Sequence, residues 1–318
     1  MEVNCEGCAG CCLDWRPLAG EGHTDDDRPG GRGGRYRPLD DTYNLAPVSR
    51  DEVSAFLDRG LAGALTPRLF RTAEGPHVTV DGVDLAALDG RPAFVVGLRK
   101  VPKPVAPLGA DPAWLPTCVF LDPTTLQCRV HDADHYPETC ATYPGSNLAV
   151  GAETECERVE RAGGGDRLLD DDPPDDAAPL FGPAAVGTRV FAHPDAERIA
   201  DAVGRLADGA PTRADRAEFV AVAAAASPGT LAVNEDRYEA AKARALDATS
   251  WVDGAVDEWA ERAPDSAALP GGRTGVDGDS EARSVPETPG VDGEARPDPS
   301  LAREVEDGRG APGTPGWE

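Results

Sequence analysis

The spacing of apolar residues along the chain predicts a mixed α+β protein. After Ser49-Arg-Asp-Glu52, which has the pattern of a helix-capping box, apolar residues recur on one helical stripe, so we expect a helix over about 49–60. Two later runs, 77–80 and 93–98, are rich in β-branched and aromatic residues and are followed or preceded by Asp-Gly turns. These runs predict a small antiparallel sheet.

The chain changes character twice after this sheet. Residues 100–116 carry five prolines, which predicts an irregular connection. From Cys118 to Cys128 the sequence has the pattern of two strands around an Asp-Pro-Thr-Thr turn, and this hairpin would bring the two thiols close together. Pro137 suits the first turn of a short helix, on which Cys140 would follow.

The second half of the chain has the pattern of a helical region. Apolar stripes predict three helices, over about 196–206, 212–226 and 234–260. Segments rich in Gly, Pro and Asp flank this region and have no core-forming pattern. The predicted organisation is a small cysteine-rich metal-binding domain with short antiparallel strands and helices at 1–162, a loop insertion at 20–40, a linker at 163–183, a helical region at 184–263 and a disordered acidic tail at 264–318.

The large negative net charge of the chain argues against two classes of binding partner. The formal net charge is −26 at pH 7, and the acidic residues are spread along the whole chain, as in proteins of salt-loving (halophilic) archaea. Such a field repels phosphate backbones and anionic lipid, so we expect neither nucleic acid nor a membrane surface as a partner. No apolar run approaches about eighteen residues and no signal peptide is recognisable, so we expect a cytoplasmic protein.

The eight cysteines are the main candidates for chemistry. Four lie within the first dozen residues and four lie far downstream, which indicates one spatial site built from two clusters. A long chain in a reducing compartment favours metal ligation over disulfides, and four thiols within eight residues are not typical of an apolar core. The candidate metal ligands are Cys5, Cys8, Cys11, Cys12, Cys118, Cys128, Cys140 and Cys156.

The spacing leaves the identity of the metal open. Cys-x2-Cys-x2-Cys matches the first three ligands of a bacterial ferredoxin run, but no Cys-Pro follows, so a fourth ligand would come from the downstream cluster. The same spacing suits zinc. Neighbouring side chains diverge in an extended backbone, so we expect that Cys11 and Cys12 do not both reach one mononuclear ion, and that one of the pair serves a second metal, a cluster edge or a redox role. His131 and His135 fit hydrogen bonding beside the metal better than direct ligation.

Further motifs accompany the cysteines and carry a resemblance. The pattern consists of Cys5-x2-Cys8-x2-Cys11-Cys12, Leu115-Pro116-x-Cys118-x-Phe120-Leu121, Cys128-x-Val-His131, Pro137-x-x-Cys140 and Tyr143-Pro144. It resembles the CxxCxxCC cysteine-cluster family (YkgJ-like), described as a zinc- or iron-chelating domain, with related domains in flagellin lysine methylases. The resemblance covers about residues 5–156 and implies metal ligation by the quoted cysteines, with Cys156 outside the quoted motifs.

Two positions depart from that family. Tyr136 and Ala141 stand where the family commonly has arginine. A role of those arginines, such as charge compensation of the cluster, therefore does not carry over to this chain.

Three functions follow from these observations. The leading hypothesis is a metal-binding protein whose thiolates hold an iron-sulfur cluster or zinc. The second is an enzyme of the protein lysine methylase kind, although no methyl-donor pocket is recognisable and the radical-type Cys-x3-Cys-x2-Cys spacing is absent from the sequence. The third is an interaction module in which zinc staples the fold.

Overall fold

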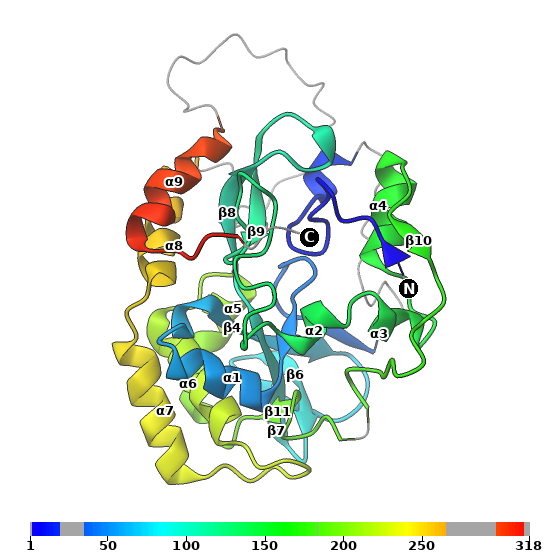
Figure 1. Ribbon diagram of the computed structural model, residues 1–318. Coiled ribbons are helices and arrows are strands. Elements are labelled where there is room, and N and C mark those ends of the chain that lie inside the picture. Colours follow the sequence, from blue (N-terminus) through cyan, green and yellow to red (C-terminus); the bar gives the residue numbers. More distant parts are fainter. Residues whose placement is uncertain (1, 20–34, 183, 265–296, 315–318) are drawn as a thin grey trace, which may run out of the picture.

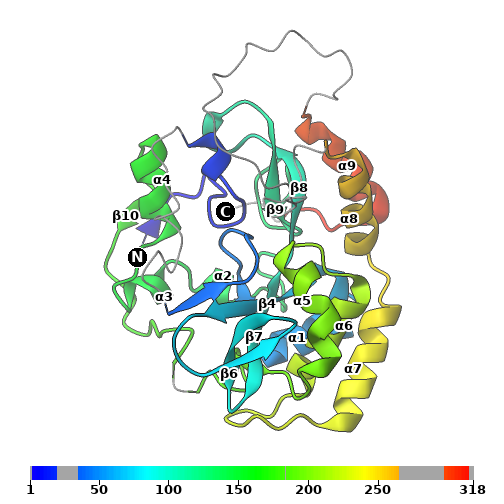
Figure 2. The ribbon, with the colours of Figure 1, turned by 180° about the vertical axis from the view of Figure 1, so that it is seen from behind.

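An antiparallel sheet forms the centre of the computed structural model, which describes residues 2–19, 35–182, 184–264 and 297–314 (Figures 1 and 2). Its strand order is β11-β7-β4-β6-β5, with β2 on β4 and β3 on β7. The strands are β2 (Tyr36–Pro38), β3 (Pro47–Val48), β4 (Leu65–Thr72), β5 (His77–Val80), β6 (Val83–Leu88), β7 (Arg91–Leu98) and β11 (Phe191–Ala192). The predicted α+β class is confirmed, and the sheet is larger than expected.

Helices cover this sheet. Helix α6 packs against β4, β7 and β11 and is itself contacted by α1 and α7. The ring of Phe94 on β7 meets that of Phe219 on α6 with centroids 4.9 Å apart. The larger helices are α1 (Arg50–Asp58), α4 (Glu155–Gly163), α5 (Ala200–Ala207), α6 (Arg213–Ala225), α7 (Glu235–Asp247) and α8 (Trp251–Arg262). Among the described residues, no helix combines the length and the apolar composition needed to cross a membrane.

Capping explains where two of these helices begin. Ser49 and Glu52 form the predicted capping box of α1. The helix predicted over 234–260 is instead two helices, because the Asp253 carboxylate accepts hydrogen bonds from the backbone and hydroxyl of Ser250 at 3.0 and 2.8 Å. This second capping box begins α8 at Trp251, so that α8 is separate from α7, which ends at Asp247.

The proline-rich segment 100–116 is a β-hairpin, which corrects the prediction of an irregular connection. Strands β8 (Lys100–Val105) and β9 (Ala113–Cys118) are antiparallel, with Pro102 opposite Pro116. In such a ladder, residue pairs whose N–H groups face the partner alternate with pairs whose N–H groups face outward. Cys118 has the same parity as Pro116, and its N–H points outward. The prolines therefore remove no bond from the ladder.

The N-terminal segment lies along the outer edge of β9. The Cys118 N–H donates to the Cys12 carbonyl at 2.7 Å, and the Asp14 N–H donates to the Pro116 carbonyl at 2.8 Å. On its other side lies α4, and β1 (Glu2–Val3) pairs with β10 (Leu168–Asp170). In both views the dark-blue segment runs between the β8–β9 hairpin and α4 (Figures 1 and 2).

Three predicted irregular segments contain regular structure. Strand β2 lies within the loop insertion predicted at 20–40, and β10 lies within the predicted linker. Part of the predicted tail folds as η7 (Pro299–Leu301), α9 (Ala302–Val305) and η8 (Asp307–Arg309). The predictions for residues 20–34, 265–296 and 315–318 lie outside the described residues.

A buried ion cluster explains why part of the tail folds. The Glu306 side chain has no exposed surface and pairs with Lys103 at 2.6 Å and with Arg129 at 2.9 Å. It also accepts a hydrogen bond from the Trp259 indole at 3.0 Å. This fold of residues 299–309 corrects the prediction of a disordered acidic tail for that part of 264–318.

Replacing Glu306 by Gln should destabilise the protein strongly. The change leaves the buried Lys103 without its anion and removes one of the three carboxylates around Arg129, a loss of roughly 3–5 kcal/mol in the free energy of unfolding. Urea unfolding followed by circular dichroism measures it. The matched control is Glu304→Gln, because Glu304 lies two residues away and its side chain is 68% exposed. Equal effects of the two substitutions would contradict the buried-cluster account.

Acid should weaken the contacts of Glu218 on α6. Burial alone would raise the pKa of this carboxyl, but hydrogen bonds from His193, Lys242 and Tyr238 lower it to about 2. Because the folded pKa lies below the unfolded value, the stabilisation is complete above about pH 4.5 and is lost as the pH falls toward 2. The difference in unfolding free energy between wild type and Glu218→Gln should shrink over that range, and a constant difference would contradict the assignment.

Candidate metal centre

Cys11 and Cys12 stand at the middle of the candidate centre. Their Sγ atoms are 3.8 Å apart. The prediction that these side chains diverge assumed an extended backbone, whereas the segment is a run of turns closed by hydrogen bonds from Cys8 N to Cys5 O and from Cys12 N to Ala9 O. With the Cys12 thiol as donor, the contact lowers the pKa of Cys11 and raises that of Cys12.

Three thiols lie beside Cys11 on the side of α4. Burial raises the pKa of Cys5 to about 11 and that of Cys156 to about 12, and repulsion from Cys11 adds to both shifts. Burial also raises the pKa of the third thiol, Cys8. The repulsion on Cys156 comes in addition from Cys5 and Cys8, so these four thiols form one neighbourhood, called here the α4 set.

The packing of α4 brings Cys156 to this neighbourhood. A capping box of Thr154 and Glu157 starts the helix immediately before Cys156. The Trp15 indole donates to the Glu155 carboxylate at 3.0 Å, which ties the N-terminal segment to the helix. Gly10 sits so close to Val159 that an added Cβ would lie 2.8 Å from its side chain. Only glycine at position 10 permits this approach without displacement.

Cys12 lies near the three remaining thiols, those of Cys118, Cys128 and Cys140. These four thiols are called here the hairpin set. Burial, followed by repulsion from Cys118, raises the pKa of Cys128 to about 12. Burial also raises the pKa of Cys118 and, further, that of Cys140. Repulsion from Cys11, Cys118 and Cys128 contributes to the raised pKa values of both Cys12 and Cys140. Cys11 also repels Cys118 and Cys128, so it borders both sets.

A tight turn and a short helix place the downstream thiols. Leu121 and Cys128 form a single antiparallel bridge, and the Asp122 carboxylate accepts hydrogen bonds from the next turn's N–H groups at Thr124 and Thr125. The predicted hairpin is therefore present as one bridge rather than two full strands. Cys140 lies on a short helix as predicted, α2 (Glu138–Ala141), but Pro137 is the extended residue before the helix rather than part of its first turn.

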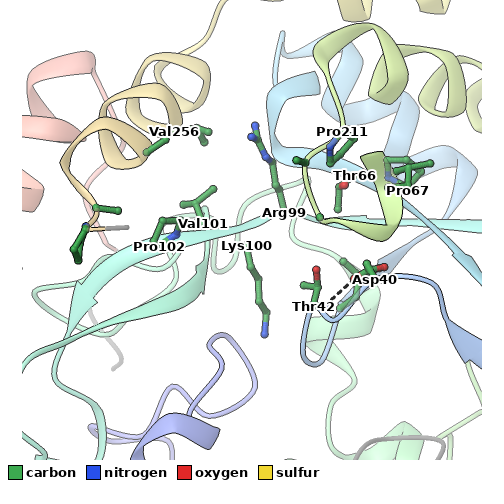
Figure 3. A pocket seen from close by; sticks show the side chains of 17 residues that line it. Asp40, Thr42, Thr66, Pro67, Arg99, Lys100, Val101, Pro102, Pro211 and Val256 are labelled. Atoms are coloured by element: carbon green, nitrogen blue, oxygen red, sulfur yellow. Dashed lines mark hydrogen bonds between the residues drawn. The ribbon is translucent and has the colours of Figure 1, made fainter. Parts of the chain in front are cut away.

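Lys100 is a buried cation beside the hairpin set. It is the cross-strand partner of Cys118, its residue is 6% exposed, and its Nζ has no hydrogen-bond partner in the described part of the chain. Figure 3 shows its amine pointing away from Arg99, toward the N-terminal segment. Burial lowers the pKa of Lys100, while the thiols of Cys12 and Cys118 oppose that shift.

Arg167 plays the corresponding part beside the α4 set. Its guanidinium donates to the Glu6 carbonyl at 3.0 Å, while its buried Nε has no hydrogen-bond partner in the described residues. Its charge favours the thiolate forms of Cys5 and Cys8. Our sequence analysis missed both cations. The signal for Lys100 was the scarcity of lysine, since the chain has only Lys100, Lys103 and Lys242 among its 31 basic residues.

The two histidines have other partners. The His131 ring lies 5.0 Å from the Tyr136 ring, and its Nδ1 is 3.0 Å from the Asp132 carboxylate. His135 packs edge-on against Phe56 with centroids 5.6 Å apart. These contacts give both rings a place beside the hairpin turn.

The donor chemistry of the centre suits a thiophilic metal. All eight cysteines are free, and soft thiolates are the ligands of zinc and of iron-sulfur clusters. In the described residues, no three His, Cys, Asp or Glu side chains stand as a group that could hold a metal ion. The thiols are thus gathered in two neighbouring sets without being closed around a common point.

Comparison with known proteins gives one family. No curated protein and no solved structure matches the chain. One protein-family match covers residues 1–318, the whole of the chain. The chain therefore belongs to the family described as "Family of unknown function (DUF7531)".

Proposed function

We propose that this protein binds metal through its eight thiolates, as an iron-sulfur or zinc protein of the cysteine-cluster type. The observation that carries the proposal is that Cys11 touches Cys12 and acts electrostatically on every other free thiol, from clusters about a hundred residues apart. The resemblance of the cysteine pattern to the CxxCxxCC family points to the same chemistry.

The two neighbourhoods suggest how the thiolates divide. The α4 set and the hairpin set contain four thiols each, and four is the ligand number of a structural zinc ion or an iron-sulfur cluster. Cys11 and Cys12 would then belong to different sets while remaining in contact. Their sequence adjacency would hold the two metal sites next to each other.

Charge balance supports bound metal if the eight cysteines are thiolates. Burial and mutual repulsion raise the pKa of every cysteine except Cys11, so the thiolate forms need added positive charge. A metal supplies most of that charge, and Lys100 and Arg167 supply one cation beside each set. They would take the role left open by Tyr136 and Ala141, where the resembled family has arginine.

Metal analysis of anaerobically purified protein tests the proposal. We expect iron with sulfide, or zinc, at roughly two four-coordinate sites per chain. Cys140→Ser and Cys156→Ser should each remove about half of the metal, because they interrupt different sets. Stoichiometric zinc without iron or sulfide would exclude the iron-sulfur version. Protein free of all three would contradict the proposal itself.

Substituting Lys100 should weaken metal retention. In Lys100→Met the bound thiolates lose their nearest cation, and groups beside a metal's ligands typically change affinity by about 10–100-fold. Competition with a chromophoric chelator measures this loss. Lys242→Met is the matched control, because Lys242 pairs with Glu218 on α6 instead of facing the thiols. Equal chelator sensitivity of the two variants would remove Lys100 from the centre.

The other two functions make different predictions for the same preparation. Binding of a methyl donor by the metal-loaded protein would favour the lysine methylase kind of enzyme. Zinc without a methyl donor, together with unfolding on chelation, would favour the zinc-stapled interaction module.

A further inference from the structure

A cavity of about 310 Å³ lies where β8 begins (Figure 3). Its walls come from β4, the start of β8, helix α8 and the turn after α5. Most of the lining is apolar, including Leu45, Val101, Leu206 and Val256. A volume of this size matches the lower end of cavities that hold small organic molecules.

The charged groups of this cavity leave one cation uncompensated. Asp40 is already neutralised, since Arg68 donates to its two carboxylate oxygens at 2.9 and 3.0 Å. Lys100 contributes to the wall, but its amine points away from Arg99, toward the N-terminal segment (Figure 3). The Arg99 guanidinium lies between Val256 and Pro211 in Figure 3, and in the described chain no hydrogen bond or ion pair engages it.

The surroundings of Arg99 favour an added anion. Burial lowers its pKa to about 9, and the like charge of Arg216 lowers it further, while Asp253 and Asp257 on α8 only partly offset these effects. A guanidinium whose charge is under-compensated gains from a bound carboxylate, which it can hold through two parallel hydrogen bonds.

We propose that this cavity binds a small organic monocarboxylate, with its carboxylate on Arg99 and its apolar body between α8, the turn after α5 and β8. The apolar walls argue against a free inorganic anion, whose hydration they cannot replace. This site is distinct from the proposed metal centre, because Arg99 directly precedes Lys100, the first residue of β8, and the two side chains point to opposite sides (Figure 3).

Titration calorimetry of the full chain at constant salt tests the site with three probes. Cyclohexanecarboxylate should bind, whereas its neutral isostere cyclohexanecarboxamide and inorganic phosphate should bind roughly tenfold more weakly or not at all. Equal affinity for the acid and the amide would overturn the role of charge. Equal affinity for phosphate and the acid would overturn the role of the apolar walls.

Two variants separate the guanidinium from the cavity itself. Arg99→Gln should weaken binding of the acid by about tenfold or more, since it removes a charged hydrogen-bond donor. Ala260→Leu should weaken it by filling the cavity from α8. The matched control is Arg237→Gln, because Arg237 is exposed on α7 away from the cavity. Binding that survives both cavity variants, in protein with wild-type melting temperature and metal content, would disprove the site.

Discussion

The arrangement of the cysteines depends on backbone pairing between residues 12–14 and the outer edge of β9. Buried N–H and C=O groups must find partners, and this edge presents the Cys118 N–H and the Pro116 carbonyl. Within residues 2–19, the only regular structure is the short pairing of β1 with β10 and a single 3-10 turn, η1 (Arg16–Leu18), so most backbone polar groups of this segment need other partners. Because it uses the edge of β9, the first cysteine cluster lies against the second, and Cys11 and Cys12 fall between the hairpin and α4.

Prolines make that edge available. In β8 and β9 they occupy outward-facing positions, so the ladder inside the hairpin is intact while the outer edge has fewer donors than an ordinary strand. An edge with few donors pairs poorly with another sheet. It still offers one N–H and one carbonyl at the spacing of a short antiparallel segment, and Leu13 occupies that position opposite Thr117.

Local signals could be predicted from the sequence, and long-range compensation could not. The capping box at Ser49, the strand patterns and the cysteine clusters are each contained in a few neighbouring residues. The hairpin at 100–116 was missed because the prolines were taken to break a strand. Prolines at every second position, where the N–H would point outward, leave the ladder of hydrogen bonds intact. The burial of Glu306, and with it the folding of the segment around it, was missed because its partners, Lys103 and Arg129, lie far away in sequence. The division of the thiols into two sets depends on α4, whose approach to Gly10 no local pattern shows.

The two buried lysines of β8 differ in how their positive charge is compensated. Lys103 uses all three of its N–H donors, on the carbonyls of Val119 and Leu121 at 2.9 Å and on Glu306 at 2.6 Å.

Lys100 is three residues earlier, so its side chain leaves the opposite face of the strand. It is nearly as buried, and beyond the Tyr43 ring at 5.9 Å the described chain offers its ammonium no acceptor. Burying an ammonium is costly unless negative charge accompanies it. On this strand the compensating charge of Lys103 comes from the chain itself. Under the proposed metal binding, that of Lys100 would come from the thiolates of Cys12 and Cys118.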